Sequence, residues 1–256
     1  MNLVIAAAQS VSVPGDIARN VARHLRFGAM AAESGVRLLV FPELSLTGYE
    51  PGIARSKAVR PDSSELDPLR RLAQDAAMTV VAGAPVLNGR NEMHLAAFAI
   101  GPDGSVSTYT KMHLHPGEED VFTPGMGGPV LRIEGVNVAL AICADTTHPE
   151  HPASAARGGA NVYAAGVLIT ENGYEPDTEL MKGYARDHGM AVLMANHSGP
   201  AGGWVPAGKS AIWCEEGRLV AASKGTEEAL VVGRRQNGVW GGTVLPVEQA
   251  VWRVFS

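Results

Sequence analysis

Residues 136–161, VNVALAICADTTHPEHPASAARGGAN, decide the fold class of this chain. They open with the continuous apolar and β-branched run Val136–Ile142, which is typical of a strand buried on both faces. Cys143 comes next, followed by helix N-cap residues at 145–147 and by Pro149 at a first helical position. The pattern predicts a buried strand that gives way to a helix, with Cys143 on the turn between them.

This position makes Cys143 a candidate nucleophile. A strand-to-helix corner points a side chain out of the end of the sheet, and the backbone N–H groups after it can face a substrate oxygen. A helix N-terminus also favours the thiolate form of a cysteine, so we expect an activated thiol here. A buried structural cysteine is the alternative that this stretch alone leaves open.

Composition sets limits on partners and compartment. The 256 residues are 46% hydrophobic and 18% charged, as in an ordinary soluble globular protein. The net charge of −5 comes without any basic run, which argues against nucleic acid or an anionic membrane as partner. Two cysteines make no disulfide framework, and no apolar run approaches the length of a membrane span. We therefore expect a cytoplasmic protein.

The N-terminal part predicts the same arrangement as the Cys143 stretch. A strand at Leu3–Gln9, a helix at 17–34 and a strand at 36–41 form a β-α-β unit, which favours an α/β fold. Glu43 follows the second strand directly, at a place where α/β folds put functional groups. The same strand–helix–strand order occurs again around Cys143, and this repetition indicates one domain, residues 1–256, built from two similar layers.

The rest of the chain yields further elements by the same signals. Pro102-Asp103-Gly104 marks the turn of a hairpin, and the second arm of that hairpin ends near Lys111, a lysine among apolar and aromatic neighbours. We predict a polar, acidic loop at 170–177 and an irregular tail at 239–256 that contains two tryptophans. The acids of 170–179 are interpreted as a solvated loop rather than a pocket rim. The other expected elements are a helix at 67–78, a helix at 179–188, and strands at 79–86, Met93–Ile100, 105–112, 161–169, 190–196, 211–215, 218–223 and 229–233.

Three motifs carry a family resemblance. They are FPELSLTGY at 41–49, YTKMHLHPGEEDVFTPG at 109–125 and ICADTTHPE at 142–150. With these motifs in this order, the chain resembles the carbon–nitrogen hydrolase (nitrilase) superfamily, in its amidase-like branch, over nearly its whole length. The resemblance implies a four-layer αββα sandwich, an α/β fold.

The resemblance also implies a catalytic triad of Glu43, Lys111 and Cys143. Glu43 is then the general base, Cys143 the nucleophile that forms a thioester, and Lys111 a stabiliser of the oxyanion together with the backbone N–H of Ala144. A second glutamate of the family, which positions substrate or the lysine, corresponds to Glu118, with Glu119 as the adjacent alternative. No cofactor and no metal are implied.

The substrate is less defined than the chemistry. Ala144 stands where the family often has an aromatic residue, and Thr146-Thr147-His148 replaces the usual bulky and basic residues; both changes affect the pocket. A small carboxamide is the expected substrate, with an N-carbamoyl amine or a nitrile as alternatives. Family members resemble one another in forming homodimers, and the apolar tail 239–256 predicts at least a dimer here.

Two other classes of function remain open. Cys143, Asp145, His148 and His151 offer four possible metal ligands within nine residues, although their spacing fits no standard zinc pattern. A catalytically silent interaction protein on the same scaffold is the second alternative. For His113, which could pair with a cysteine, we predict a structural role because the triad already contains a base.

Overall fold

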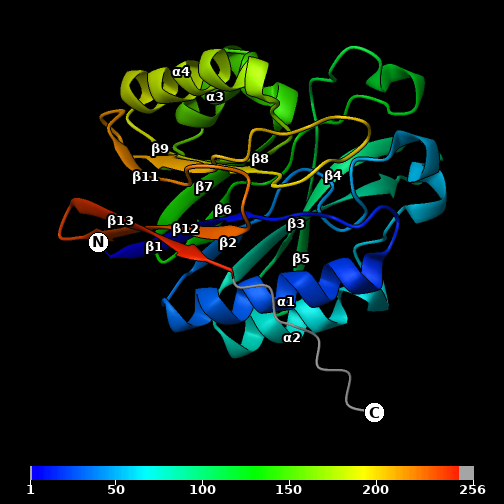
Figure 1. The fold of residues 1–256 in the computed structure, drawn as a ribbon, viewed down its shortest axis with the longest axis horizontal. Coiled ribbons are helices and arrows are strands. Elements are labelled where there is room, and N and C mark those ends of the chain that lie inside the picture. The colour runs from blue at the N-terminus through cyan, green and yellow to red at the C-terminus, as the bar shows by residue number, and fades with distance from the viewer. Residues whose placement is uncertain (1, 248–256) are drawn as a thin grey trace.

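A computed structural model describes residues 2–247, and in it two β-sheets lie face to face between two pairs of helices (Figure 1). Helices α1 (Ile17–Glu33) and α2 (Asp67–Asp75) cover the outer face of one sheet. Helices α3 (Glu150–Arg157) and α4 (Glu171–His188) cover the outer face of the other. The expected four-layer αββα sandwich is confirmed. Among the described helices, none has both the length and the apolar character needed to cross a membrane.

Each sheet is mixed, with a parallel centre and antiparallel edges. The seven-stranded sheet has the order β13 (Val239–Pro246), β12 (Ala229–Gln236), β1 (Leu3–Gln9), β2 (Leu38–Val40), β3 (Thr79–Leu87), β4 (Met93–Ile100), β5 (Val106–Thr110). The six-stranded sheet has the order β11 (Leu219–Ala222), β10 (Ala211–Trp213), β9 (Ala191–Asn196), β8 (Val162–Val167), β7 (Val136–Ile142), β6 (Leu131–Ile133).

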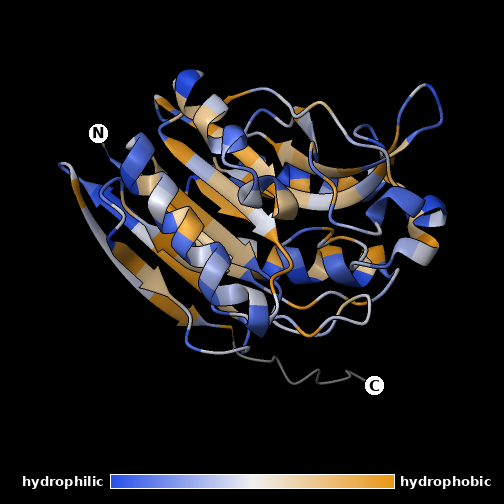
Figure 2. Ribbon diagram, turned by 90° about the horizontal axis from the view of Figure 1, so that it is seen from above, coloured by the Kyte–Doolittle hydropathy of each residue, from blue (hydrophilic) through white to orange (hydrophobic). Residues whose placement is uncertain are grey.

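The central strands are apolar without interruption because both of their faces are covered. In β1, Val4 and Ala6 pack toward the helices, whereas Leu3 and Ile5 pack into the layer between the sheets. Figure 2 shows the central strands as mostly hydrophobic, with hydrophilic residues on the outer turns of the helices. Because successive side chains of a strand point to opposite faces, one apolar run contributes residues to two separate apolar layers.

The two predicted β-α-β units are present, one in each sheet. β1 and β2 pair in parallel around α1, and β7 and β8 pair in parallel around α3. Glu43 follows β2 and Cys143 follows β7, so both residues lie beyond the carboxyl ends of parallel strands. The stacking of β2 on β8 brings these two strand ends together.

The prediction of a loop at 170–177 is wrong, because α4 begins at Glu171 and continues to His188. Gly173 and Pro176 are poor helix residues, and Pro176 within the helix lacks the N–H that would bond to the preceding turn. Packing overrides this local preference: Met181 and Ala185 are fully buried against the six-stranded sheet. Tertiary burial rather than propensity fixes where this helix starts.

The prediction of an irregular tail is wrong for its first part. Residues Val239–Pro246 form β13, which pairs with β12 in an antiparallel hairpin. The connecting residues Asn237 and Gly238 have φ values of 50° and 83°, the left-handed conformations that a two-residue hairpin turn requires. The Asn-Gly pair is the sequence signal that would have revealed this hairpin. Residues 248–256 of the predicted tail lie outside the described residues, and a dimer contact by the tail stays a prediction.

Candidate active site

A buried lysine lies at the centre of the site. Lys111 follows β5 and is fully buried, and its Nζ lies 2.8 Å from Oε1 of Glu43 and 2.8 Å from Oε1 of Glu118. Burial alone would lower the pKa of Lys111, but the two carboxylates outweigh it and raise that pKa, so the ammonium stays charged. The structure thus brings Glu43, which is 68 residues away in the sequence, into contact with Lys111, whereas Glu118 follows Lys111 by seven residues.

Glu43 is also buried, with 3% of its surface exposed. Burial raises the pKa of its carboxyl to about 7, against the opposing effect of the Lys111 charge. A carboxyl that titrates near neutral pH can both accept and return a proton, which is the property that a general base needs.

The turn that carries Glu43 is held where the two sheets meet. A Cβ on Gly166 of β8 would lie 2.6 Å from the carbonyl oxygen of Phe41, and one on Gly83 of β3 would lie 2.4 Å from the amide nitrogen of Leu44. Both positions therefore need glycine. The ring of His197, whose pKa is lowered to about 4 by burial, is neutral and donates from Nε2 to the Glu43 carbonyl oxygen at 2.7 Å.

Cys143 lies on the corresponding turn of the other sheet, at the first residue of a 3₁₀ turn, Cys143–Thr147. Its φ of 44° is left-handed, an uncommon and strained conformation for a residue with a side chain. Its Sγ lies 3.6 Å from the carbonyl oxygen of Leu168. The expectation that a helix N-terminus activates the thiol is wrong: α3 begins only at Glu150, and burial, helped by the charge of Glu43, raises the pKa of Cys143.

Asp145 ties the Cys143 turn to the segment that carries Lys111. Its Oδ1 accepts the backbone N–H groups of Met112 and His113 at 3.1 and 2.9 Å. Its Oδ2 accepts the N–H of Ile142 at 3.0 Å and the hydroxyl of Tyr109 at 2.7 Å. The carboxylate is fully buried and thus fixes the strand end before Cys143 against the residues on either side of Lys111.

Glu118 and not Glu119 belongs to the site. Besides Lys111, the buried Glu118 carboxylate accepts hydrogen bonds from the hydroxyl of Tyr49 and the backbone N–H of His115, both at 2.8 Å. Glu119 is exposed, and its carboxylate accepts the N–H of Gly117. Sequence reasoning missed Tyr49, although it closes the motif that begins with Phe41.

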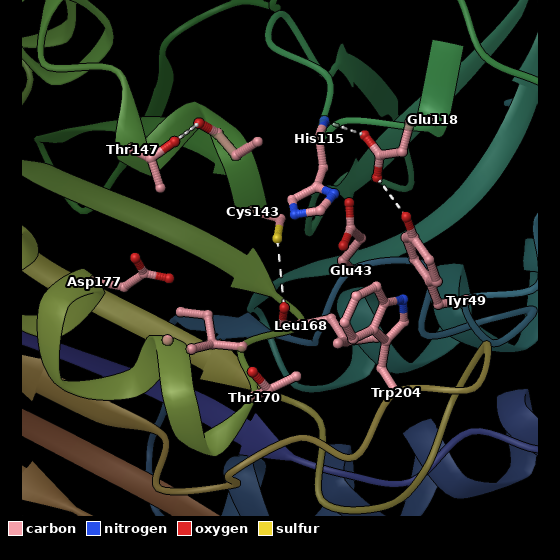
Figure 3. A pocket seen from close by; sticks show the side chains of 13 residues that line it. Glu43, Tyr49, His115, Glu118, Cys143, Thr147, Leu168, Thr170, Asp177 and Trp204 are labelled. Carbon is pink, nitrogen blue, oxygen red and sulfur yellow. Dashed lines mark hydrogen bonds between the residues drawn. The ribbon is translucent and has the colours of Figure 1, made fainter. Parts of the chain in front are cut away.

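These residues open onto a cavity of about 180 Å³ (Figure 3). Ala144, whose backbone N–H the sequence singled out, lines it beside Cys143. Asp177 also lines it, so the interpretation of the 170–179 acids as a solvated loop is wrong for this residue. The remaining lining residues are Glu43, Tyr49, His115, Glu118, Thr147, Leu168, Ile169, Thr170, Gly173 and Trp204.

His113 lies behind the site rather than in it. Its Nδ1 is 3.1 Å from Oδ1 of Asp145, its ring stacks on His148 at 4.0 Å, and it does not line the cavity. These contacts agree with the predicted structural role.

The proposed metal-ligand residues do not converge. Both ring nitrogens of His151 contact tyrosine hydroxyls, those of Tyr109 and Tyr163, at 2.8 Å, and Asp145 is occupied by the contacts above. Within residues 2–247 no group of three or more histidine, cysteine, aspartate or glutamate side chains is arranged to hold a metal ion.

Comparison with known proteins identifies the family. The family model for carbon-nitrogen hydrolases matches residues 4–243. An (R)-stereoselective amidase from a Pseudomonas species is 31% identical over 192 residues, which are 72% of this chain and 67% of that enzyme. A nitrilase from Pyrococcus abyssi is 28% identical over 207 residues, covering 79% of this chain and 78% of that enzyme.

The fold has close counterparts among solved structures. The amidase of Nesterenkonia sp. AN1, in a double mutant bound to acrylamide, superposes with a TM-score of 0.84 and 27% identity, covering 92% of this chain and 91% of that one. A variant of the same amidase carries the acetamide moiety of fluoroacetamide on its active-site cysteine, also with a TM-score of 0.84. The chain therefore belongs to the carbon–nitrogen hydrolase family, as an amidase-like enzyme that acts on carbon–nitrogen bonds other than peptide bonds.

Proposed function

We propose that the protein hydrolyses the carboxamide C–N bond of a small molecule through a thioester on Cys143. The observation that carries this proposal is the contact of the buried Lys111 ammonium with the Glu43 and Glu118 carboxylates, beside a cavity that the Cys143 side chain lines. A base, a fixed positive charge and a nucleophile then meet at one small cavity.

The first half-reaction forms the thioester. Glu43 takes the thiol proton as the sulfur bonds to the amide carbon, because burial keeps the resting Cys143 thiol protonated and a base must act during attack. The tetrahedral intermediate then collapses with cleavage of the C–N bond, and Glu43 returns the proton to the departing nitrogen, which leaves as ammonia or an amine.

The oxyanion of the tetrahedral intermediate faces fixed positive charge. We assign its stabilisation to the Lys111 ammonium and the Ala144 backbone N–H, where one such donor typically contributes about 3–4 kcal/mol of transition-state stabilisation. Glu118 holds the ammonium in place through its 2.8 Å contact, while Tyr49 and the His115 N–H orient Glu118.

The second half-reaction uses water. Glu43 removes a proton from the water that attacks the thioester carbon, the C–S bond breaks, and the proton passes to the sulfur, which restores the Cys143 thiol and releases a carboxylic acid.

The cavity favours an amide over an N-carbamoyl amino acid. Its lining, as far as the described chain provides it, includes no lysine or arginine that could bind the carboxylate of such a substrate. The amide ligands of the solved relatives, acrylamide and butyramide in the Nesterenkonia amidase, agree with this choice.

A substrate screen tests the proposal. Small amides, nitriles and N-carbamoyl compounds are incubated with the protein and with a Cys143→Ala control, and released ammonia is measured. We expect ammonia from aliphatic amides with the native protein alone. Turnover of nitriles only, or of N-carbamoyl compounds only, would move the function to that branch, and no turnover of any kind would favour a silent scaffold.

The homodimer expected from the sequence remains part of the proposal. Because 239–246 form β13, a truncation at Gly238 removes a strand as well as the tail. Light scattering on the full chain and on a chain that ends at Val247 is the cleaner comparison, and a monomeric full chain would refute the dimer.

A further inference from the structure

We propose that Asp177 makes this site selective for amides that carry a protonated amine, with the Asp177 carboxylate binding the ammonium group of the substrate. The inference rests on the proposed function, since it names the class of amide that the Cys143 site accepts. Asp177 lies on α4, and Figure 3 shows its carboxylate on one side of the Cys143 thiol with Trp204 on the other.

The carboxylate of Asp177 has no partner of its own. Within residues 2–247 it makes neither a hydrogen bond nor an ion pair, although it is half-buried in the cavity wall. Its burial raises the pKa of Asp177, and the charge of His115 offsets that shift only in part. A half-buried charge in this state gains free energy from a cationic ligand.

The charge balance of the cavity points the same way. The lining acids are Glu43, Glu118 and Asp177. Among residues 2–247 the one lysine or arginine that contacts any of them is Lys111, which the first two carboxylates already bind, and Asp177 is left with the partial charge of the His115 imidazole. The site therefore carries an excess of negative charge that attracts a cation and repels an anionic substrate.

The space beside Asp177 is open to a ligand. Gly173 lies one helical turn before Asp177 on the same wall, and a Cβ there would lie 3.6 Å from both Oδ2 of Asp177 and the side chain of Ile169. The absence of that side chain leaves room next to the carboxylate. Leu168 and Ile169 supply apolar surface for the methylene groups between the amide and the amine.

Matched substrate pairs test the inference. Glycinamide, β-alaninamide, 4-aminobutanamide and 5-aminopentanamide are compared with their neutral isosteres propanamide, butanamide, pentanamide and hexanamide at neutral pH, with kcat/KM from ammonia or acid release. Succinamate serves as the anionic amide. We expect one spacer length at which the amino amide exceeds its isostere by about ten- to a hundredfold, as for a hydrogen bond to a charged group. Succinamate should be the poorest substrate.

The variant Asp177→Asn keeps the shape and removes the charge. We expect the ratio of amino amide to isostere to fall to near one in Asp177→Asn and to persist in Glu175→Gln, which removes an exposed charge from the same helix. Equal rates for both series in the native protein, or a preference that survives in Asp177→Asn, would overturn the inference and leave the amidase proposal intact. Hydrolysis of neither series would overturn both.

Discussion

The turns at Glu43, after β2, and at Cys143, after β7, occupy corresponding places in the two β-α-β units but are held by different means. At the Glu43 turn, backbone packs directly on backbone, because Gly83 and Gly166 have no side chains that would clash with the turn. His197 also donates a hydrogen bond to the Glu43 carbonyl oxygen. The Cys143 turn is half open to the cavity and is held by one buried carboxylate, that of Asp145.

This difference relates burial to the chemical task of each turn. Glu43 is buried although it also lines the cavity, and the lost hydration raises its pKa to about 7, where a carboxylate can exchange protons at neutral pH. Cys143, the proposed nucleophile, is half-buried on the cavity wall, its backbone is left-handed, and the hydrogen bonds of Asp145 hold its turn. The Glu43 turn thus sets the proton affinity of a carboxylate, whereas the Cys143 turn sets the position of a thiol.

The largest loss of activity is expected from a substitution that removes the chemical function of Glu43 and keeps the shape of its side chain. Glu43→Gln cannot accept a proton, and we expect kcat/KM for an amide to fall by about 10²–10⁴-fold.

The next largest loss is expected from Lys111→Arg. This substitution keeps the charge but replaces the ammonium with a wider guanidinium, and we expect kcat/KM to fall by about 10²–10³-fold. Steady-state kinetics with circular dichroism as a folding control measure both; near-normal rates in either variant would remove that residue from the proposed triad.

A smaller loss should follow from disturbing the packing behind Glu43. The new Cβ in Gly166→Ala would lie 2.6 Å from a backbone oxygen, so the turn must shift, at a cost of about 1–3 kcal/mol in stability. A displacement of this kind can lower kcat by about 10²-fold. Gly241→Ala is the matched control, because that strand glycine has no atom within 4 Å of the new Cβ. Equal denaturation midpoints and rates for the two variants would contradict the packing argument.

The Cys143 turn has its own test in Asp145→Asn. One carboxylate oxygen becomes an amide NH₂ that faces either the Met112 and His113 N–H groups or the Ile142 N–H. We expect a loss of about 1–3 kcal/mol in the free energy of unfolding. Activity should drop by about tenfold through kcat rather than KM, since the geometry of Cys143 and Lys111 is disturbed and the cavity wall is not. A change confined to KM would show that Asp145 acts on binding instead.

The pH dependence is a further, graded test. Glu43 must be deprotonated to act as a base and has a raised pKa of about 7, so its active form is lost as the pH falls through that value. As the pH is lowered well below 7, we expect kcat/KM to fall about tenfold for each pH unit. Above pH 7 we expect kcat/KM to reach a plateau. A profile that stays flat down to pH 5 would mean that no group with this pKa controls the reaction.

Local patterns were sufficient for most of the fold. The β-α-β units around Glu43 and Cys143 followed from apolar runs and cap residues, because strands covered on both faces have a distinctive composition. The start of α4 did not follow, since Gly173 and Pro176 oppose helix formation and only the burial of residues such as Met181 stabilises it. The β13 strand differs from the predicted irregular tail because Asn237-Gly238 forms a two-residue hairpin turn that pairs the following residues with β12.

The candidate site divides along similar lines. Glu43, Lys111, Glu118 and Cys143 lie in sequence motifs, and the structure brings them together. His197 and Asp177 reach the site from distant segments. Their contacts depend on how two sheets and a helix pack, and no local sequence pattern predicts such packing. The groups proposed as catalytic could thus be named from the sequence, whereas the group proposed to select the substrate required the fold.

The central claim is that Cys143 is the nucleophile, and alkylation by iodoacetamide tests it most directly. The protein is labelled in stages, the modified cysteine is located by peptide mass mapping, and amide hydrolysis is measured at each stage in the native protein and in Cys214→Ala. We predict that activity falls in proportion to the label on Cys143, that butyramide slows both, and that Cys214→Ala behaves as the native protein does. Full amide hydrolysis by protein that is completely alkylated at Cys143 would contradict the account.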